Sequence, residues 1–357
     1  MHILHLQTEL RLSCGVTRVI FQLMKNASAD SAHFVLAFGG NAVYKFKKER
    51  LFIKTIPRYI KYAALLLHVY EIYTFCKEKN ITVIHAHHRY FDLAASIAAR
   101  FLGIPVVTSV HSKVTSKKLF SYRAGHFIAV SNTIKQHLIK VFNISPEKIT
   151  LIHNFVDETT YSTIGLDPEL LKNKLGIYGE RTVIAFIGRF SKEKGVDVLL
   201  QAFRKLQYEY VDLTLLLIGD GEEKREMVKQ IHAKLKDVKI IDPQEDIAPY
   251  YQLADIIVLP SRVDPYPIVM LEAGLMKKAF IAAKVDGIGE FIRDGINGIL
   301  VQPNDISDLI SGLSKLLDSS ALRFELSEHL HKKVMETSLK EHVLPKYYAL
   351  YASLAGK

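Results

Sequence analysis

The chain of 357 residues has only two cysteines, Cys14 and Cys76. So few thiols cannot build a disulfide framework, and their scarcity is typical of a reducing compartment. The opening residues, MHILHLQTELRL, lack the basic start and long apolar core of a secretion signal. No stretch reaches the roughly 18 to 20 apolar residues that span a bilayer. We therefore expect a cytoplasmic protein that is soluble or bound peripherally to the inner face of a membrane.

Several chemical signatures are missing as well. The sequence has no Ser/His/Asp or Cys/His arrangement for nucleophilic catalysis, and no Asp-x-Asp in a plausible metal-holding position. His85, His87 and His88 in IHAHHRYFD are possible metal ligands, but they lack the neighbouring carboxylates and cysteines of a convincing metal site. No helix-turn-helix, zinc-finger or RNA-recognition motif is present, which argues against nucleic acid as a partner. We therefore expect neither a metal cofactor nor a nucleic-acid partner.

Acidic residues are scarce in the first half of the chain. Residues 1–160 carry 21 Lys and Arg against 9 Asp and Glu, a net charge of +12, whereas the remainder has a net charge of −2. Seven basic residues between 45 and 61 alternate with Phe46, Phe52 and Tyr59, and the apolar run 62–75 follows. This mixture suits the anionic surface of a bilayer, with the aromatic rings inserted. The alternative is a solvated loop followed by a core helix.

The length exceeds the usual size of one hydrophobic core, so we expect two domains. Short apolar runs alternate with helical stretches in both halves, which is the βαβ pattern of parallel sheets. The sequence therefore predicts an α/β protein with a domain break after residues 154–157. The strands we expect cover residues 3–6, 83–85, 106–109, 127–130, 183–187, 215–218, 256–259 and 280–282.

One loop pairs cations with glycines. After the strand 183–187 comes GRFSKEKG, in which Gly188 frees the strand end, Arg189 can fork onto phosphate oxygens and Lys194 adds a point charge. Arg and Lys in loops are usually only solvated. Here the spacing before a helix favours a phosphate-binding role instead.

The stretch from 254 to 298 brings two carboxylates to a strand-loop-helix turn. The strand 256–259 stops at Pro260 and a helical pattern begins at Pro267, so Asp264 and Glu272 lie on either side of the helix start. A second strand leads through DGIG at 286–289 into a helix that we expect to begin at Glu290. Glycines before a helix let the backbone approach an anion. We therefore predict one wall of a nucleotide crevice here.

These motifs together resemble the retaining glycosyltransferases of family four, also called glycosyl transferases group 1. The resemblance rests on the acid at 264 with seven residues before Glu272, the G-R-x-x-x-x-K-G loop and the D-G-x-N-G run at 294–298. It implies the GT-B fold, two Rossmann-like domains facing a cleft. By it, residues 1–160 bind the acceptor, 161–337 bind a nucleotide sugar, and 338–357 form a helix that crosses back to the first domain.

The resemblance also implies roles for individual residues. Asp264 corresponds to the acid that contacts the donor sugar, and Glu272 to the one that holds the ribose hydroxyls. His111, in VVTSVHS, corresponds to a histidine near the reaction centre. The implied catalytic residues are His111, Asp264, Arg189 and Lys194, and the implied donor-binding residues are Gly15, Gly188, Arg189, Lys194, Ile268, Val269 and Glu272. Asp replaces the usual Glu at 264, and Phe155 replaces a glycine.

The expected activity is transfer of a sugar, with retention, from a nucleoside diphosphate sugar to a hydroxyl of a glycan or lipid-linked acceptor, giving an α-linkage. The resemblance implies a place in bacterial surface polysaccharide or lipopolysaccharide synthesis. Two alternatives stay open: a nucleotide-sugar epimerase of the same architecture, and a non-catalytic sugar-nucleotide-binding protein at the membrane surface.

Overall fold

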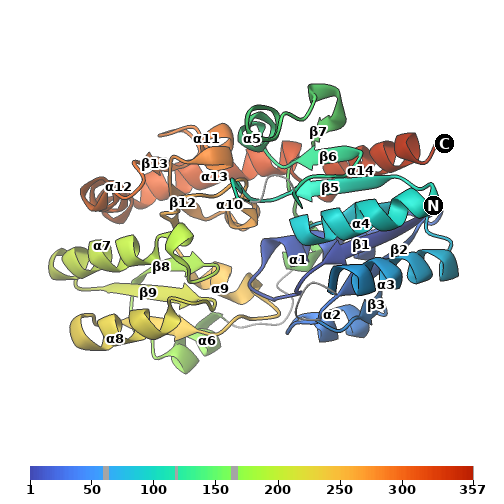
Figure 1. Cartoon of the computed structure of the whole chain (residues 1–357). Coiled ribbons are helices and arrows are strands. Elements are labelled where there is room, and N and C mark those ends of the chain that lie inside the picture. Colours follow the sequence, from blue (N-terminus) through green and yellow to red (C-terminus); the bar gives the residue numbers. More distant parts are fainter. Residues whose placement is uncertain (59–63, 117–119, 162–167, 357) are drawn as a thin grey trace. The chain divides into compact units, whose positions relative to one another are not determined.

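The computed structural model describes all residues except 59–63, 117–119, 162–167 and 357. The described residues form two compact units (Figure 1). The N-terminal unit contains Met1–Asn154 and Glu341–Lys357, and the C-terminal unit contains Phe155–Lys340. Among the helices that the structure describes, none has the length and apolarity to cross a membrane.

The N-terminal unit is built on a seven-stranded parallel sheet in the order β3-β2-β1-β4-β5-β6-β7. Its strands are β1 (His2–Gln7), β2 (Ala32–Ala37), β3 (Phe52–Thr55), β4 (Val83–Ala86), β5 (Val106–Val110), β6 (His126–Ala129) and β7 (Ile149–Leu151). Its helices are α1 (Gly15–Lys25), α2 (Val43–Lys48), α3 (Ala64–Glu78), α4 (Arg89–Leu102), α5 (Asn132–Phe142) and, apart from its first residue, α14 (Lys340–Leu354).

The C-terminal unit has a six-stranded parallel sheet in the order β10-β9-β8-β11-β12-β13. Its strands are β8 (Thr182–Ile187), β9 (Leu213–Ile218), β10 (Val238–Ile241), β11 (Ile256–Leu259), β12 (Ala279–Ala283) and β13 (Ile299–Val301). Its helices are α6 (Pro168–Leu175), α7 (Val196–Glu209), α8 (Lys224–Lys234), α9 (Ala248–Leu253), α10 (Ile268–Leu275), α11 (Asp286–Phe291), α12 (Ile306–Asp318) and α13 (Ser320–Thr337).

The predicted fold class, two α/β domains with parallel sheets, is confirmed. The central strands are nearly continuous apolar runs because helices cover both faces of such a sheet: every residue of β9 and β11 is buried. One helix boundary was wrong. Helix α11 begins at Asp286 rather than at Glu290, so the glycines 287 and 289 lie inside its first turns.

The basic segment 45–61 is not a free loop. Residues up to Lys48 form α2, and Phe46 is fully buried in a core cluster where its ring meets Phe21 edge to face, with 5.3 Å between centroids. The prediction that Phe46 inserts into a membrane is therefore wrong, because the helical turn points this ring inward. Phe52, on β3, is 41% exposed. Tyr59 and Lys61 lie outside the described residues.

Glycines let neighbouring loops of the C-terminal unit touch through their backbones. Gly195 has φ +69°, and a Cβ there would lie 2.0 Å from the carbonyl oxygen of Pro260, which follows β11. A Cβ on Gly219 would lie 1.8 Å from the carbonyl oxygen of Gly188. Since side chains cannot fit at these contacts, the loops after β8, β9 and β11 are packed into one group.

We expect Gly195→Ala to lower the free energy of unfolding of this unit much more than Gly179→Ala does. Gly179 is a matched control, because its φ is +75° and a Cβ at this position would meet nothing within 4 Å. The left-handed conformation alone costs roughly 1 kcal/mol, and the clash with Pro260 should add about 1 to 3 kcal/mol. Denaturant unfolding of both variants measures this, and equal losses would show that the close contact is unimportant.

Candidate active site

The strand order reverses once in the C-terminal sheet, between β8 and β11. From β8 the chain moves to β9 and β10, and then returns to add β11, β12 and β13 on the other side. In open parallel sheets, ligands bind at the carboxyl ends of the strands beside such a switch point. The loop 188–195 follows β8 and the loop 260–267 follows β11, so both predicted motifs flank this position.

The two loops are joined by a partly buried ion pair. The ammonium of Lys194 donates to Oδ2 of Asp264, whose side chain is only 5% exposed. Ser261 Oγ donates to the same carboxylate oxygen at 3.3 Å, and the backbone N–H of Asp264 donates to Oδ2 of Asp286 at 3.0 Å. The structure thus brings together Lys194 and Asp264, which are 70 residues apart. It leaves Arg189 exposed on the same loop.

A second ion pair holds the loops, and sequence reasoning missed it. Arg262 donates through both terminal nitrogens to the carboxylate of Asp197, each at 2.7 Å, and its backbone N–H donates to the Glu193 carbonyl at 2.7 Å. The bidentate guanidinium lowers the pKa of Asp197. This pair fixes the start of α7 against the loop after β11. Nothing in the local pattern around either residue indicates it.

Helix α10 begins beside these loops. Ile268 and Val269 form its first turn, and Pro267 at the N-cap makes no side-chain hydrogen bond to it. The first amides of a helix lack partners within the helix, and the helix dipole adds partial positive charge there. These two residues therefore present a backbone surface suited to an anion.

Glu272 lies further along α10 and is completely buried. Its carboxylate accepts hydrogen bonds from the hydroxyl of Tyr251, at 2.6 Å, and from the hydroxyl of Tyr161. Each oxygen of this carboxylate therefore accepts one tyrosine hydroxyl. The sequence predicted Glu272 but not the two tyrosines, because they come from distant segments.

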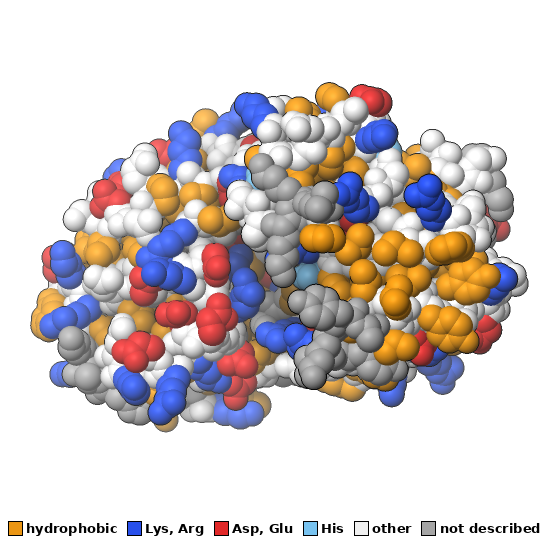
Figure 2. Space-filling view, in the orientation of Figure 1, with side chains coloured by type: hydrophobic (Ala, Val, Ile, Leu, Met, Phe, Trp, Pro, Cys, Tyr) orange, Lys and Arg blue, Asp and Glu red, His pale blue; other side chains and the backbone are white. Residues whose placement is uncertain are grey.

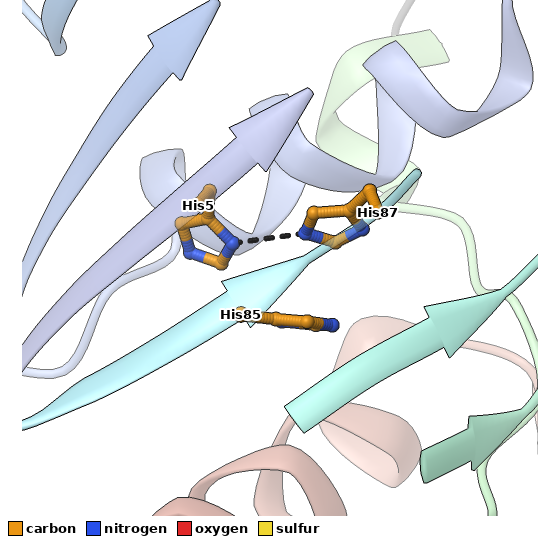
Figure 3. Close-up of side chains that lie close together, drawn as sticks. All are labelled: His5, His85 and His87. Atoms are coloured by element: carbon orange, nitrogen blue, oxygen red, sulfur yellow. Dashed lines mark hydrogen bonds between the residues drawn. The ribbon is translucent and has the colours of Figure 1, made fainter. Parts of the chain in front are cut away.

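The N-terminal sheet also has one reversal, between β1 and β4. Helix α1 begins at Gly15, which is exposed at the carboxyl end of β1. His5 on β1 and His85 on β4 are register partners, and His87 follows β4 directly (Figure 3). His111, which follows β5, is partly exposed, and burial lowers its pKa to about 4.

Three of these histidines form a compact buried group. His5 Nδ1 and His87 Nε2 are hydrogen-bonded at 3.0 Å, and the rings of His85 and His87 have centroids 3.9 Å apart (Figure 3). One nitrogen from each of the three rings lies within 4.8 Å of the others. His88 does not join this group: its side chain accepts the N–H of Tyr90 and so caps α4. His5, contributed by the first strand, was missed.

Comparison with known proteins identifies the family. The model of glycosyl transferases group 1 matches residues 167–334, and the model of glycosyltransferase family 4 matches residues 14–160. The chain belongs to this family of glycosyltransferases. The two matches together cover both units, and they place the switch-point loops of the C-terminal sheet inside the group 1 match.

Two curated relatives illustrate the range of the family. An N-acetyl-alpha-D-glucosaminyl L-malate synthase from Bacillus anthracis is 27% identical over 77% of this chain and 75% of its own length. A UDP-Gal:alpha-D-GlcNAc-diphosphoundecaprenol alpha-1,3-galactosyltransferase from Escherichia coli is 25% identical over 93% of this chain and 92% of its own.

A solved structure shows the same fold. The Anabaena protein Alr3699/HepE, in complex with UDP-glucose, has a TM-score of 0.88 and 20% identity, and the match covers 99% of this glycosyltransferase and 100% of that protein. This likeness places the chain among the GT-B glycosyltransferases by fold.

Proposed function

We propose that this glycosyltransferase moves a sugar, with retention, from a nucleoside diphosphate sugar to a hydroxyl group of a glycan or lipid-linked acceptor, forming an α-linkage. Surface polysaccharide or lipopolysaccharide synthesis is the setting we propose. The observation that carries the proposal is the Lys194–Asp264 ion pair at the switch point between β8 and β11.

The chemistry of the C-terminal unit suits a nucleoside diphosphate. Arg189 and Lys194 supply positive charge on one loop, and the first turn of α10 supplies amides at Ile268 and Val269. Gly188 adds no side chain to the start of that loop. Glu272 is matched to hydroxyl donors, as a ribose diol would provide. We assign the diphosphate to the cations and the α10 amides, and the ribose to Glu272.

The proposed transfer breaks the bond between the anomeric carbon and the β-phosphate oxygen and forms a bond from that carbon to the acceptor oxygen. The bonding electrons leave with the diphosphate, and the acceptor hydroxyl proton passes to a phosphate oxygen on the same face. Arg189 and Lys194 stabilise the negative charge that develops on the leaving group. Asp264, held by Lys194, is assigned to the donor sugar.

We expect Arg189→Ala and Lys194→Ala each to lower donor turnover by roughly 10²- to 10³-fold, since each removes a charge that stabilises the transition state. A thermal-shift screen of UDP, GDP and ADP sugars identifies the donor first, because a specific ligand raises the melting temperature by mass action. Turnover is then measured with that donor and an acceptor extract.

Lys192→Ala is the matched control, because Lys192 is an exposed cation of the same loop. It should keep near wild-type turnover. Wild-type rates in both the Arg189 and the Lys194 variants, with the fold intact, would refute the assignment of the diphosphate. Interconversion of free nucleotide sugars without an acceptor would instead identify an epimerase, and donor binding without turnover a non-catalytic protein.

We also propose that the reaction needs no divalent metal, because Arg189, Lys194 and the first amides of α10 together stabilise the diphosphate, although Asp264 balances part of the charge of Lys194. Activity should therefore survive exhaustive chelation and dialysis unchanged. Loss of activity in chelator that magnesium or manganese restores would overturn this. Melting curves with and without chelator provide the control for indirect effects on stability.

A lipid-linked acceptor requires access to a membrane surface, and the N-terminal unit exposes a suitable face. Helix α3 is apolar on two sides: Ile72 and Phe75 are buried, whereas Leu66 is 70% and Tyr70 64% exposed. On α4, which packs against α3, Phe101 is 75% exposed. Figure 2 shows hydrophobic side chains gathered over these helices with Lys and Arg at the margins. We propose that this face docks on anionic lipid.

We expect the protein to sediment with anionic vesicles more than with neutral ones. Each Lys or Arg near the surface contributes about 1 kcal/mol at low salt, and 1 M salt shortens the Debye length to about 3 Å. Replacing Lys45, Lys47, Lys48 and Arg50 with Ser should weaken the preference for anionic lipid. Leu66→Gln with Tyr70→Gln should remove the binding that survives in high salt.

Tyr208→Gln with Val211→Gln is the matched control, because these side chains are 77% and 83% exposed but belong to the C-terminal unit. This variant should bind vesicles as the wild type does. Equal recovery with neutral and anionic vesicles, unchanged by either set of substitutions on the N-terminal unit, would contradict membrane docking.

A further inference from the structure

A continuous chain of four imidazoles runs from β2 to the loop after β5. His33 Nδ1 is hydrogen-bonded to His5 Nε2 at 2.9 Å, and His5 Nδ1 to His87 Nε2 at 3.0 Å. His87 Nδ1 then lies 3.5 Å from His111 Nε2, with the two ring planes only 19° apart. The first three rings are buried. The chain therefore ends at the one partly exposed ring, His111.

The four imidazoles of this hydrogen-bonded chain are electrically neutral. Burial lowers the pKa of His33 and of His111 to about 4, and it lowers the pKa of His5 and of His87 as well. A neutral imidazole has one N–H and one lone pair. Each contact in the chain needs one of each, so all the protons must point the same way along it. Two arrangements remain, toward His111 or away from it.

The far end of the chain distinguishes the two arrangements. His33 Nε2 is buried and has no hydrogen-bond partner among the residues that the structure describes. If the protons point away from His111, this atom is an N–H without an acceptor; if they point toward His111, it is only an unused lone pair. Buried N–H groups without partners are rarer than under-used acceptors. The arrangement that points toward His111 is therefore favoured.

We propose that the chain His33–His5–His87 fixes the tautomer of His111, so that His111 accepts a hydrogen bond at Nε2 and carries its proton on Nδ1. His111 is then a neutral donor with no free lone pair. Such a group can donate to any acceptor oxygen, and we assign it to a hydroxyl oxygen of the sugar. It is not the base that takes the acceptor proton. The assignment to sugar rests on the proposed function; the tautomer does not.

His85 lies beside this chain of imidazoles, and its hydrogen bonds leave it no nitrogen for a metal ion. Its Nδ1 is hydrogen-bonded to the hydroxyl of Tyr351 and its Nε2 to Ser109 Oγ, both at 2.7 Å. Both nitrogens are thus already engaged, although the ring centroid lies 3.9 Å from that of His87, with the ring planes tilted by 33°. His5, His33 and His87 are positioning residues, because they act on a ligand only through His111.

Nitrogen NMR of the wild-type protein labelled with ¹⁵N-histidine tests the tautomer of His111. The His111 signals are assigned as those that disappear from the spectrum of His111→Gln. The expected result is a protonated Nδ1 and an unprotonated Nε2. A proton on Nε2, or bound metal detected by elemental analysis of the purified protein, would overturn the proposal.

Substitutions then test whether the tautomer of His111 depends on the chain of imidazoles. His5→Leu breaks it and should give His111 a mixture of tautomers, whereas His5→Gln, which keeps a donor and an acceptor, should largely preserve the wild-type state. His68→Leu is the matched control: His68 is 1% exposed in the same unit and is hydrogen-bonded to Tyr90 and Pro57 instead. A His111 spectrum that His5→Leu leaves unchanged would contradict the role of the chain.

Turnover measurements distinguish whether His111 acts as a hydrogen-bond donor or as a base. If His111 donates, His111→Gln should retain activity within about tenfold and His111→Leu should lose more, since glutamine still offers an N–H. Equal, severe losses in both variants would refute the donor role. If no sugar donor turns over at all, the proposed function is wrong. The NMR experiment still decides the tautomer of His111, because it does not depend on turnover.

Discussion

The parallel order of both sheets is the constraint on which the rest of the structure depends. Parallel strands bring all their carboxyl ends to one edge, and each sheet reverses its strand order once. Loops that are far apart in sequence must therefore meet at that reversal. In the C-terminal unit the meeting produces the Lys194–Asp264 pair. In the N-terminal unit the reversal brings His87, in the loop after β4, against His5 of β1.

The loops at the C-terminal reversal are held by backbone contact as much as by charge. Gly195 and Gly219 let carbonyl groups approach where any side chain would clash, and the Arg262–Asp197 pair ties the same loops together. This support matters because a buried carboxylate such as Asp264 is costly without its partner. Lys194 and Arg262 are thus each held in place by a carboxylate partner.

The sequence predicted the strands and the loops of the site because both leave local patterns. Apolar runs marked β8 and β11, and glycine with a cation marked the loop between β8 and α7. What it could not predict depends on pairs brought together by the fold. Tyr161 and Tyr251 reach Glu272 from separate segments, and alternating basic and aromatic residues did not reveal that Phe46 turns into the core. Contacts between distant segments produce no periodic pattern in the sequence.

The two units differ in how they can recognise a ligand. The C-terminal switch point combines Lys194 and Arg189 with the first turn of α10, an arrangement that suits an anion. The N-terminal reversal instead holds histidines that burial keeps neutral, although this half of the chain carries a net charge of +12. The C-terminal unit therefore offers charged groups at its switch point, whereas the N-terminal unit offers uncharged hydrogen-bonding groups.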